Sequence, residues 1–118
     1  MNTRAYGNEG EQSACDYLCS KGWKIVDRNV RRGRGEIDII ARKRKVIAFV
    51  EVKRRRGTAY GRPAEAVNLQ KQARIAQTAA LYMQENDLSD ANVRFDVIEI
   101  LPGEIRHIEG AFDATDLF

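Results

Sequence analysis

Two apolar stretches decide how this chain folds: GEIDIIA at residues 35–41 and VIAFVEVK at residues 46–53. Both are rich in Ile, Val, Ala and Phe, a composition typical of buried strands. Each nevertheless carries acidic residues. Because burying an unpaired carboxylate is costly, buried acids are normally paired, hydrogen-bonded or bound to metal. Glu36, Asp38 and Glu51 therefore need a physical explanation, and the search for one leads from this sequence to a function.

The two stretches predict a hairpin that gathers charged side chains on one face. Side chains alternate between the faces of a strand, so Glu51 and Lys53 share a face, as do Glu36 and Asp38. A two- or four-residue loop within residues 42–45 predicts pairing of residues whose numbers sum to 87. This register places Glu36 opposite Glu51 and Asp38 diagonal to it, about 7–8 Å away. An odd loop would turn Asp38 to the other face.

Such a face favours a magnesium site. Mg²⁺ takes oxygen ligands, keeps several waters and is typically held by one or two carboxylates plus substrate phosphate. Asp38 and Glu51 suit this role, and Glu36 is a further candidate acid. Lys53 would orient water or stabilise charge on a phosphate in the transition state. The alternative is a structural ion-pair network, in which Lys53 pairs with Glu51 and nearby arginines pair with the other acids.

The charge of the chain is unevenly distributed. Residues 31–56 hold eleven basic and three acidic residues, a net charge of +8, whereas the whole chain carries +3. A concentrated positive zone indicates a polyanionic partner, with phosphates the usual candidate. A solvated basic hairpin without a partner is the alternative, and charge alone does not decide between them.

The rest of the chain predicts two helices and three more strands around the hairpin. The predicted elements are a helix over residues 9–21, a strand over 23–30, a turn over 31–35, a basic loop over 54–61, a helix over 63–86 and strands over 91–100 and 105–109. Glu11 lies on the apolar face of the first of these helices. The order α-β-β-β-α-β-β predicts an α/β fold, a mixed sheet flanked by helices in three layers. A single domain spanning residues 1–118, with its core at about 7–112, is expected.

Neither composition nor the cysteines indicate export or zinc binding. No apolar run is long enough to span a membrane and the N-terminus lacks a signal-peptide core, so we expect a cytoplasmic protein without a membrane partner. Cys15 and Cys19 lie four residues apart in the first helix. With one histidine in the chain, a structural zinc site lacks ligands, and apolar packing is the simpler role for the thiols.

Several motifs together resemble the YraN family of small bacterial proteins. The resemblance extends from about Gly7 to Phe112 and rests on Gly10-Glu11, Arg28-Asn29, Gly35-Glu36-Ile37-Asp38, Phe49-Val50-Glu51-Val52-Lys53, Ala66-Val67 with Lys71, and Arg94-Phe95-Asp96-Val97. This family is similar in turn to the PD-(D/E)xK nuclease superfamily, which has the restriction-endonuclease-like fold and includes archaeal Holliday junction resolvases and tRNA-splicing endonuclease-like domains.

The superfamily resemblance implies a magnesium- or manganese-dependent phosphodiesterase. It places Asp38 at the aspartate of the motif and Glu51 and Lys53 at its Glu-x-Lys. Glu11 falls where many members carry a helical glutamate that completes the metal site. The proline that usually precedes the motif aspartate is replaced here by Ile37. Since junction-cleaving relatives act as dimers, the resemblance also implies a homodimer.

The leading hypothesis is therefore a metal-dependent endonuclease that acts on DNA or RNA by shape rather than by base sequence. Its catalytic residues would be Asp38, Glu51, Lys53 and Glu11, with the three acids binding metal. Phosphate contacts would come from Arg31, Arg32, Arg34, Arg54, Arg55, Arg56 and Lys71.

Two alternatives to the endonuclease hypothesis remain, and the roles of three further residues are considered separately. The alternatives are a non-catalytic nucleic-acid-binding module that keeps the nuclease fold and an interaction scaffold with a basic surface. Lys71 either reaches a phosphate or extends past Ile75 to solvent. Asp96 is expected to pair structurally with Arg94, and His107 is expected to be a surface strand residue.

Overall fold

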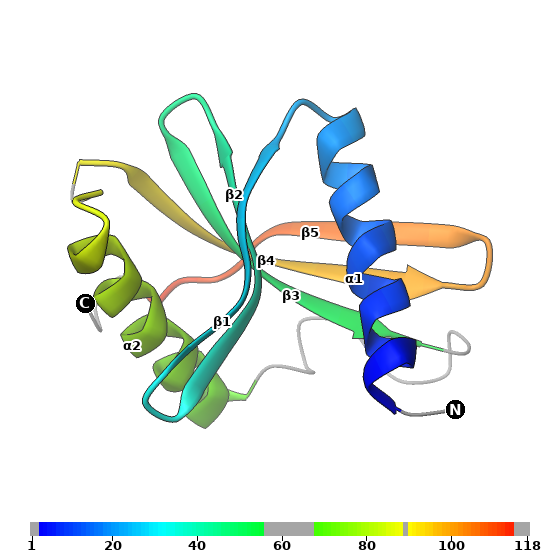
Figure 1. The fold of residues 1–118 in the computed structure, drawn as a ribbon, viewed down its shortest axis with the longest axis horizontal. Coiled ribbons are helices and arrows are strands. Elements are labelled where there is room, and N and C mark those ends of the chain that lie inside the picture. Colours follow the sequence, from blue (N-terminus) through cyan, green and yellow to red (C-terminus); the bar gives the residue numbers. More distant parts are fainter. Residues whose placement is uncertain (1–2, 56–67, 89, 115–118) are drawn as a thin grey trace.

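The computed structural model describes residues 3–55, 68–88 and 90–114, with side chains from Glu9 onward. Its elements follow the predicted order α-β-β-β-α-β-β (Figure 1): α1 (Thr3–Ser20), β1 (Lys24–Arg32), β2 (Gly35–Lys43), β3 (Val46–Arg54), α2 (Leu69–Glu85), β4 (Asn92–Leu101) and β5 (Glu104–Phe112). Within these ranges, neither helix combines the length and the apolar composition needed to cross a membrane.

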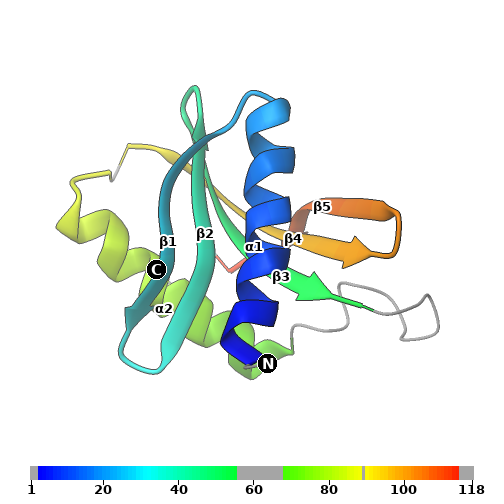
Figure 2. The ribbon, with the colours of Figure 1, turned by 45° about the vertical axis from the view of Figure 1, so that its right-hand side comes forward.

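The five strands form one mixed sheet in the order β1-β2-β3-β4-β5. All neighbours are antiparallel except β3 and β4, which run parallel and are joined through α2. The two helices lie against opposite faces of the sheet (Figures 1 and 2). This confirms the predicted α/β fold with three layers.

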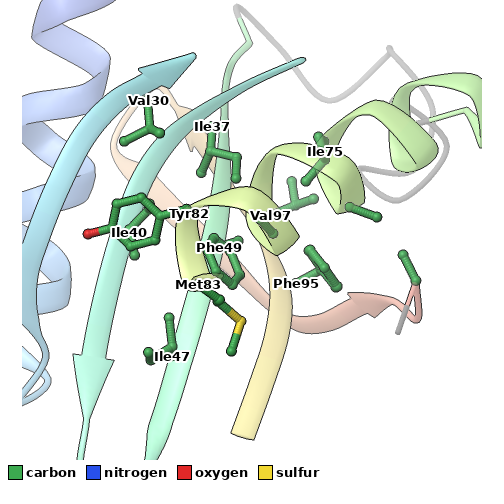
Figure 3. Packing of buried hydrophobic residues seen from close by; sticks show 13 residues of the cluster. Val30, Ile37, Ile40, Ile47, Phe49, Ile75, Tyr82, Met83, Phe95 and Val97 are labelled. Carbon is green, nitrogen blue, oxygen red and sulfur yellow. The ribbon is translucent and has the colours of Figure 1, made fainter. Parts of the chain in front are cut away.

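Each helix buries an apolar stripe against its own side of the sheet. On the α2 side, Phe49 is the centre of an aromatic cluster (Figure 3), with ring centroids 6.4 Å from Tyr82 and 5.7 Å from Phe95. On the α1 side, Leu18 and Trp23 pack with small residues of β2 and β3, including Ala41 and Ala48. The two cores hold the helices on the sheet, because apolar burial is the main favourable contribution to folding.

The hairpin register differs from the predicted one. Lys43 pairs with Val46 and Ile39 with Val50, so paired numbers sum to 89 rather than 87. The loop is a two-residue turn at Arg44-Lys45, with Arg44 at a φ of 57°. Because the loop is still even, the predicted face is kept, but β3 is displaced by two residues along β2. Continuing this register brings Asp38, not Glu36, level with Glu51.

Other boundaries also shift. β1 and β2 extend farther than predicted, which reduces the turn at residues 31–35 to Gly33-Arg34. The first helix begins earlier than residue 9, and β5 continues to Phe112 instead of ending at residue 109. The predicted start of the second helix, at residue 63, and part of the basic loop lie outside the described residues. Both cysteines are free thiols, Cys15 buried and Cys19 exposed.

Candidate active site

The candidate site forms where β1 and β2 change the face that they present to the two cores. Ile37 packs in the core under α2, whereas Ile39, two residues later, packs in the core under α1. On β1, Asn29 has a φ of 53° and lies between the residues that pair with Ile37 and Ile39. Regular alternation is therefore broken at Asp38. Asp38 lies at this break, and its side chain is partly buried between the fully buried Ile37 and Ile39.

Asp38 is anchored by the backbone of the next strand. The Val52 N–H donates a hydrogen bond to Asp38 Oδ2 at 2.8 Å. The pKa of Asp38 is raised to about 7, first by burial and then by the nearby charge of Glu51, while the Val52 hydrogen bond acts in the opposite direction. Both burial and the Glu51 charge thus disfavour the ionised form of Asp38, and a cation bound nearby would favour it.

Glu51 lies under two lysines. Its Oε1 is 3.3 Å from Lys53 Nζ and 2.6 Å from Lys71 Nζ. Burial lowers the pKa of Lys53, helped by its contact with Lys71 and opposed by Glu51. Burial is the largest single influence on Lys71 and acts to lower its pKa, but the hydrogen bonds to Glu51 and Lys53 and the charges of Glu51 and Asp38 together outweigh it, and the pKa is raised. Lys71 thus binds Glu51 rather than extending past Ile75 into solvent, and its expected contact with a substrate phosphate stays a prediction.

These groups border an open cavity of about 330 Å³ between β2, β3 and the start of α2. Glu36, Asp38 and Glu51 contribute acidic groups to it. Basic and amide groups surround them, and the remaining polar lining residues are Arg34, Asn68, Gln70, Lys71 and Arg74. The cavity therefore combines a carboxylate pair with cationic walls, which suits a phosphate group carrying a metal ion.

Glu11 is buried, as predicted from its place on the apolar face of α1, but it does not join the carboxylate pair. Its side chain is 12% exposed. The Oε2 atom makes no hydrogen bond and lies 3.7 Å from Arg28 Nη2. Among the residues that the structure describes, no three Asp, Glu, His or Cys side chains form a ready-made metal cluster. The three-ligand set expected from Glu11, Asp38 and Glu51 is thus not gathered, although Glu11 is near enough to raise the pKa of Asp38.

Comparison with known proteins places the chain in a family. Residues 10–100 match the family described as "Uncharacterised protein family UPF0102". The chain belongs to this family, which is the YraN family. UPF0102 proteins of Symbiobacterium thermophilum and Clostridioides difficile are each 45% identical to it, over 117 and 114 residues. Both alignments cover 95% of this chain, with 99% and 100% of the respective relatives.

The fold of this UPF0102 protein is similar to that of a solved nuclease. A Holliday junction resolvase of Archaeoglobus fulgidus, Hjc, aligns with a TM-score of 0.53 over 86% of this chain and 75% of the resolvase. At 16% sequence identity the likeness concerns the fold. It confirms the expected restriction-endonuclease-like architecture.

The site of the UPF0102 protein fits a divalent cation through two residues, Asp38 and Glu51. Magnesium is commonly held by one or two carboxylates and retains waters that phosphate oxygens can replace. The pKa of Asp38 is raised by burial first and by the charge of Glu51 second, and a cation bound to both carboxylates would oppose both effects. Glu11 Oε2 is a further nearby oxygen, which makes no hydrogen bond and lies 3.7 Å from Arg28 Nη2.

Most of the arginines predicted to bind nucleic acid are already engaged with acids. The pairs are Arg31 with Glu36 at 3.4 Å, Arg32 with Glu85 at 2.8 Å, Arg54 with Glu9 at 3.5 Å and Arg55 with the buried Glu99 at 3.4 Å. Arg34 lines the cavity, and Arg56 lies outside the described residues. Since exposed ion pairs are weak, the first three arginines remain available for exchange, whereas Arg55 is held by a buried carboxylate.

Sequence reasoning missed Arg74 and Gln70 as cavity residues. The sequence feature that could have identified them is the helix cap Asn68, whose side chain accepts a hydrogen bond from the Lys71 N–H and fixes the N-terminus of α2. Lys71 and Arg74 follow three residues apart, so they project from one face. The predicted start at residue 63 concealed how close these side chains are to the helix end.

A second buried acid, Asp96, belongs to a separate network. It is fully buried and accepts hydrogen bonds from Arg94 at 2.9 Å and from the Gly110 N–H at 3.0 Å. The expected pairing with Arg94 is confirmed. The prediction that His107 is a surface residue is wrong, because its side chain is 6% exposed and Nε2 lies 2.7 Å from Asp96. Its Nδ1 lies 3.3 Å from the Tyr17 hydroxyl, so α1 is linked to this network.

Proposed function

We propose that this UPF0102 protein is a divalent-metal-dependent nuclease that hydrolyses internal phosphodiester bonds in structured DNA or RNA. The observation that carries the proposal is the arrangement at Glu51. A half-buried aspartate, Asp38, is hydrogen-bonded to the adjacent Val52 backbone, and Lys53 lies 3.3 Å from Glu51 on the same strand. An open cavity with basic walls adjoins these groups.

Each residue has a distinct role in this mechanism. Asp38 and Glu51 would hold Mg²⁺ or Mn²⁺, with Glu11 as an outer acid and Glu36 at the cavity edge. The chemistry that the cation supplies is polarisation of a phosphoryl oxygen and activation of water.

The protein would do the rest by positioning. The Val52 N–H fixes the orientation of the Asp38 carboxylate. Lys53 would donate to the phosphate as charge develops in the transition state. The water oxygen would bond to phosphorus as the water gives up a proton to solvent, the ester P–O bond would break, and the leaving oxygen would take up a proton from solvent.

The basic surface supports a nucleic-acid substrate recognised by its backbone. Arg34, Lys71 and Arg74 border the cavity, and Arg31, Arg32 and Arg54 extend positive charge beyond it. Contacts of this kind give salt-dependent binding that carries little sequence information. The similarity in fold to a Holliday junction resolvase makes branched DNA the first substrate to examine.

A cleavage screen tests the proposal. Branched DNA, single strands and structured RNA would be incubated with Mg²⁺ or Mn²⁺ and the wild-type protein, Asp38→Ala or Lys53→Ala, with Asp16→Ala as an exposed-residue control. We expect cutting by the wild type and the control only. Cutting that persists unchanged in Asp38→Ala and Lys53→Ala would refute the site. Binding without cutting on any substrate would support the non-catalytic nucleic-acid-binding module instead.

A further inference from the structure

Lys71 competes for the carboxylate that the proposed metal needs. Its Nζ lies 2.6 Å from Glu51 Oε1, closer than Lys53 at 3.3 Å to the same oxygen. The Glu51 side chain is 9% exposed, whereas the Lys71 side chain is 37% exposed. The carboxylate is therefore fixed by its strand, and the ammonium reaches it from the more open side of the site.

The position of Lys71 in α2 does not serve the helix itself. It is the third residue of α2, and Arg74 follows one turn later. Cations near a helix N-terminus face the positive end of the helix dipole, which is unfavourable, and α2 has no acidic residue in its first turn. Two cations at this end, both lining the cavity, indicate an anionic ligand there. A phosphate group of the substrate has the required charge and oxygen acceptors.

We propose that Lys71 moves from Glu51 to a substrate phosphate, and that this exchange couples nucleic-acid binding to divalent-cation binding. The inference rests on the proposed function and adds a regulatory step to it. In the free protein the ammonium of Lys71 opposes a divalent cation at Glu51, because like charges a few ångströms apart repel. When a phosphate draws Lys71 away, Glu51 keeps Lys53 and gains room for the cation.

The exchange must be reciprocal. If nucleic acid tightens cation binding by some factor, the cation tightens nucleic-acid binding by the same factor. Lys71→Met removes the competing charge and also the phosphate contact, so it should remove the coupling in both directions. Arg74→Met is the matched comparison. It removes one positive charge from the same helix face and cavity, so it should weaken DNA binding, but it leaves the Lys71–Glu51 contact in place and should therefore keep the coupling.

The test measures Mn²⁺ binding by the decrease in the free-ion EPR signal. Wild type, Lys71→Met, Lys71→Arg and Arg74→Met would each be titrated with and without a phosphorothioate DNA duplex. We expect Lys71→Met alone to bind Mn²⁺ about tenfold more tightly than wild type in the absence of DNA, within the range of about 5- to 150-fold typical of coupled sites. The duplex should tighten Mn²⁺ binding in wild type, Lys71→Arg and Arg74→Met but not in Lys71→Met.

The outcomes separate this inference from the proposed function. Equal Mn²⁺ affinity in wild type and Lys71→Met, or undiminished coupling in Lys71→Met, would overturn the role of Lys71 while leaving a metal site in place. Mn²⁺ binding that is absent from every variant, with and without DNA, would overturn both. Thermal unfolding of each variant would verify that it is folded, which we expect because the Lys71 side chain is more than one-third exposed.

Discussion

The backbone N–H of Val52 donates to Oδ2 of Asp38 where the pairing of β2 with β3 ends. The last paired residues are Ile39 and Val50, so the Asp38 side chain supplies the acceptor that the next backbone carbonyl would otherwise provide. A carboxylate is thereby held at the opening of the two strands, next to Glu51. The same bond that completes the sheet also orients the proposed metal ligand.

Asp38→Asn should stabilise the metal-free protein at neutral pH. The pKa of Asp38 is raised from 3.8 to about 7, so the folded state binds a proton more readily than the unfolded state between these values. The stability of the wild type should therefore fall as pH rises from about 4 to 7, by at most about 4 kcal/mol from this group. Asparagine retains an acceptor for the Val52 N–H and carries no charge. Urea denaturation at pH 4.5 and 7.5 with EDTA measures the difference.

The control for this prediction is Asp16→Asn, an exposed aspartate on α1 that accepts a hydrogen bond from Gln12. It should leave the pH dependence of the wild type in place. An Asp38→Asn variant whose stability changes with pH in parallel with the wild type would show that the ionisation of Asp38 does not cause this pH dependence.

Divalent cations should stabilise the protein through the same two carboxylates. A ligand that binds only the folded state at 100 times its Kd adds about 2.7 kcal/mol. Mg²⁺ or Mn²⁺ should therefore raise the Tm of the wild type but not of Asp38→Asn or Glu51→Gln. Glu104→Gln, which changes an exposed glutamate paired with Arg106, should keep the wild-type response. Calorimetric scans with and without metal provide the measurement, and an equal shift in Asp38→Asn would contradict the assignment.

Much of this arrangement could be predicted from the sequence, because alternation along β3 puts Glu51 and Lys53 on one face and an even hairpin loop turns that face towards Asp38. Asp38, Glu51 and Lys53 were predicted together for this reason. The break in alternation between Ile37 and Ile39 could not be predicted. The exact register could not be predicted, since a two-residue turn can occupy several positions within the run Arg42–Lys45. A displacement of two residues preserves the apolar pattern and changes only which acid lies level with Glu51.

The contacts of Lys71 were beyond sequence reasoning for a different reason. They depend on where α2 begins and how closely it approaches β2, which tertiary packing decides. The network of Asp96 and His107 likewise joins residues of β4, β5 and α1. No local periodicity reports contacts of this kind.

Lys53→Met should lower the catalytic rate rather than substrate binding. Lys53 is on the strand that carries Glu51 and would act only as charge develops on the phosphate. Removing a single stabilising donor of this kind costs about 10²–10³ in kcat. Single-turnover cleavage, with binding measured separately by fluorescence anisotropy, distinguishes the two effects. Lys24→Met, an exposed lysine on β1, provides the charge-matched comparison, and an equal loss in both variants would argue for a general electrostatic effect.

Gly35→Ala should destabilise the protein and displace α2. A Cβ at residue 35 would overlap the Thr78 hydroxyl and the Arg74 carbonyl, closer than real Cβ contacts. Overpacking of this kind costs about 1–3 kcal/mol. Gly10→Ala is the matched control, since its added Cβ would lie 3.7 Å from the Arg54 side chain, an ordinary contact. Within a helix this change should stabilise by about 0.5–1 kcal/mol. Equal stabilities of the two variants would contradict the close approach of α2 to β2.

Asp96→Asn should have the opposite effect to Asp38→Asn. Burial acts to raise the pKa of Asp96, but hydrogen bonds from His107, Arg94 and the Gly110 N–H outweigh it and the pKa is lowered. The charged form therefore stabilises the fold above the ordinary pKa of an aspartate, and this contribution is lost as pH falls through the lowered value. Breaking a buried pair costs about 3–5 kcal/mol at pH 7, and Arg94 would keep only its ion pair with the exposed Glu109, at 3.5 Å.

Chemical denaturation at pH 7 and pH 3 measures this cost, which should shrink at the lower pH. The metal-induced rise in Tm should persist in Asp96→Asn, because Asp96 does not line the cavity and is not one of the two proposed metal ligands. The structural role of Asp96 would be contradicted if Asp96→Asn stabilised the protein at pH 7 or abolished the response to Mg²⁺. Asp96 and Asp38 would then not have the separate roles proposed for them. Opposite signs at the two aspartates are expected because three donors compensate Asp96, whereas Asp38 has one donor and a second carboxylate beside it.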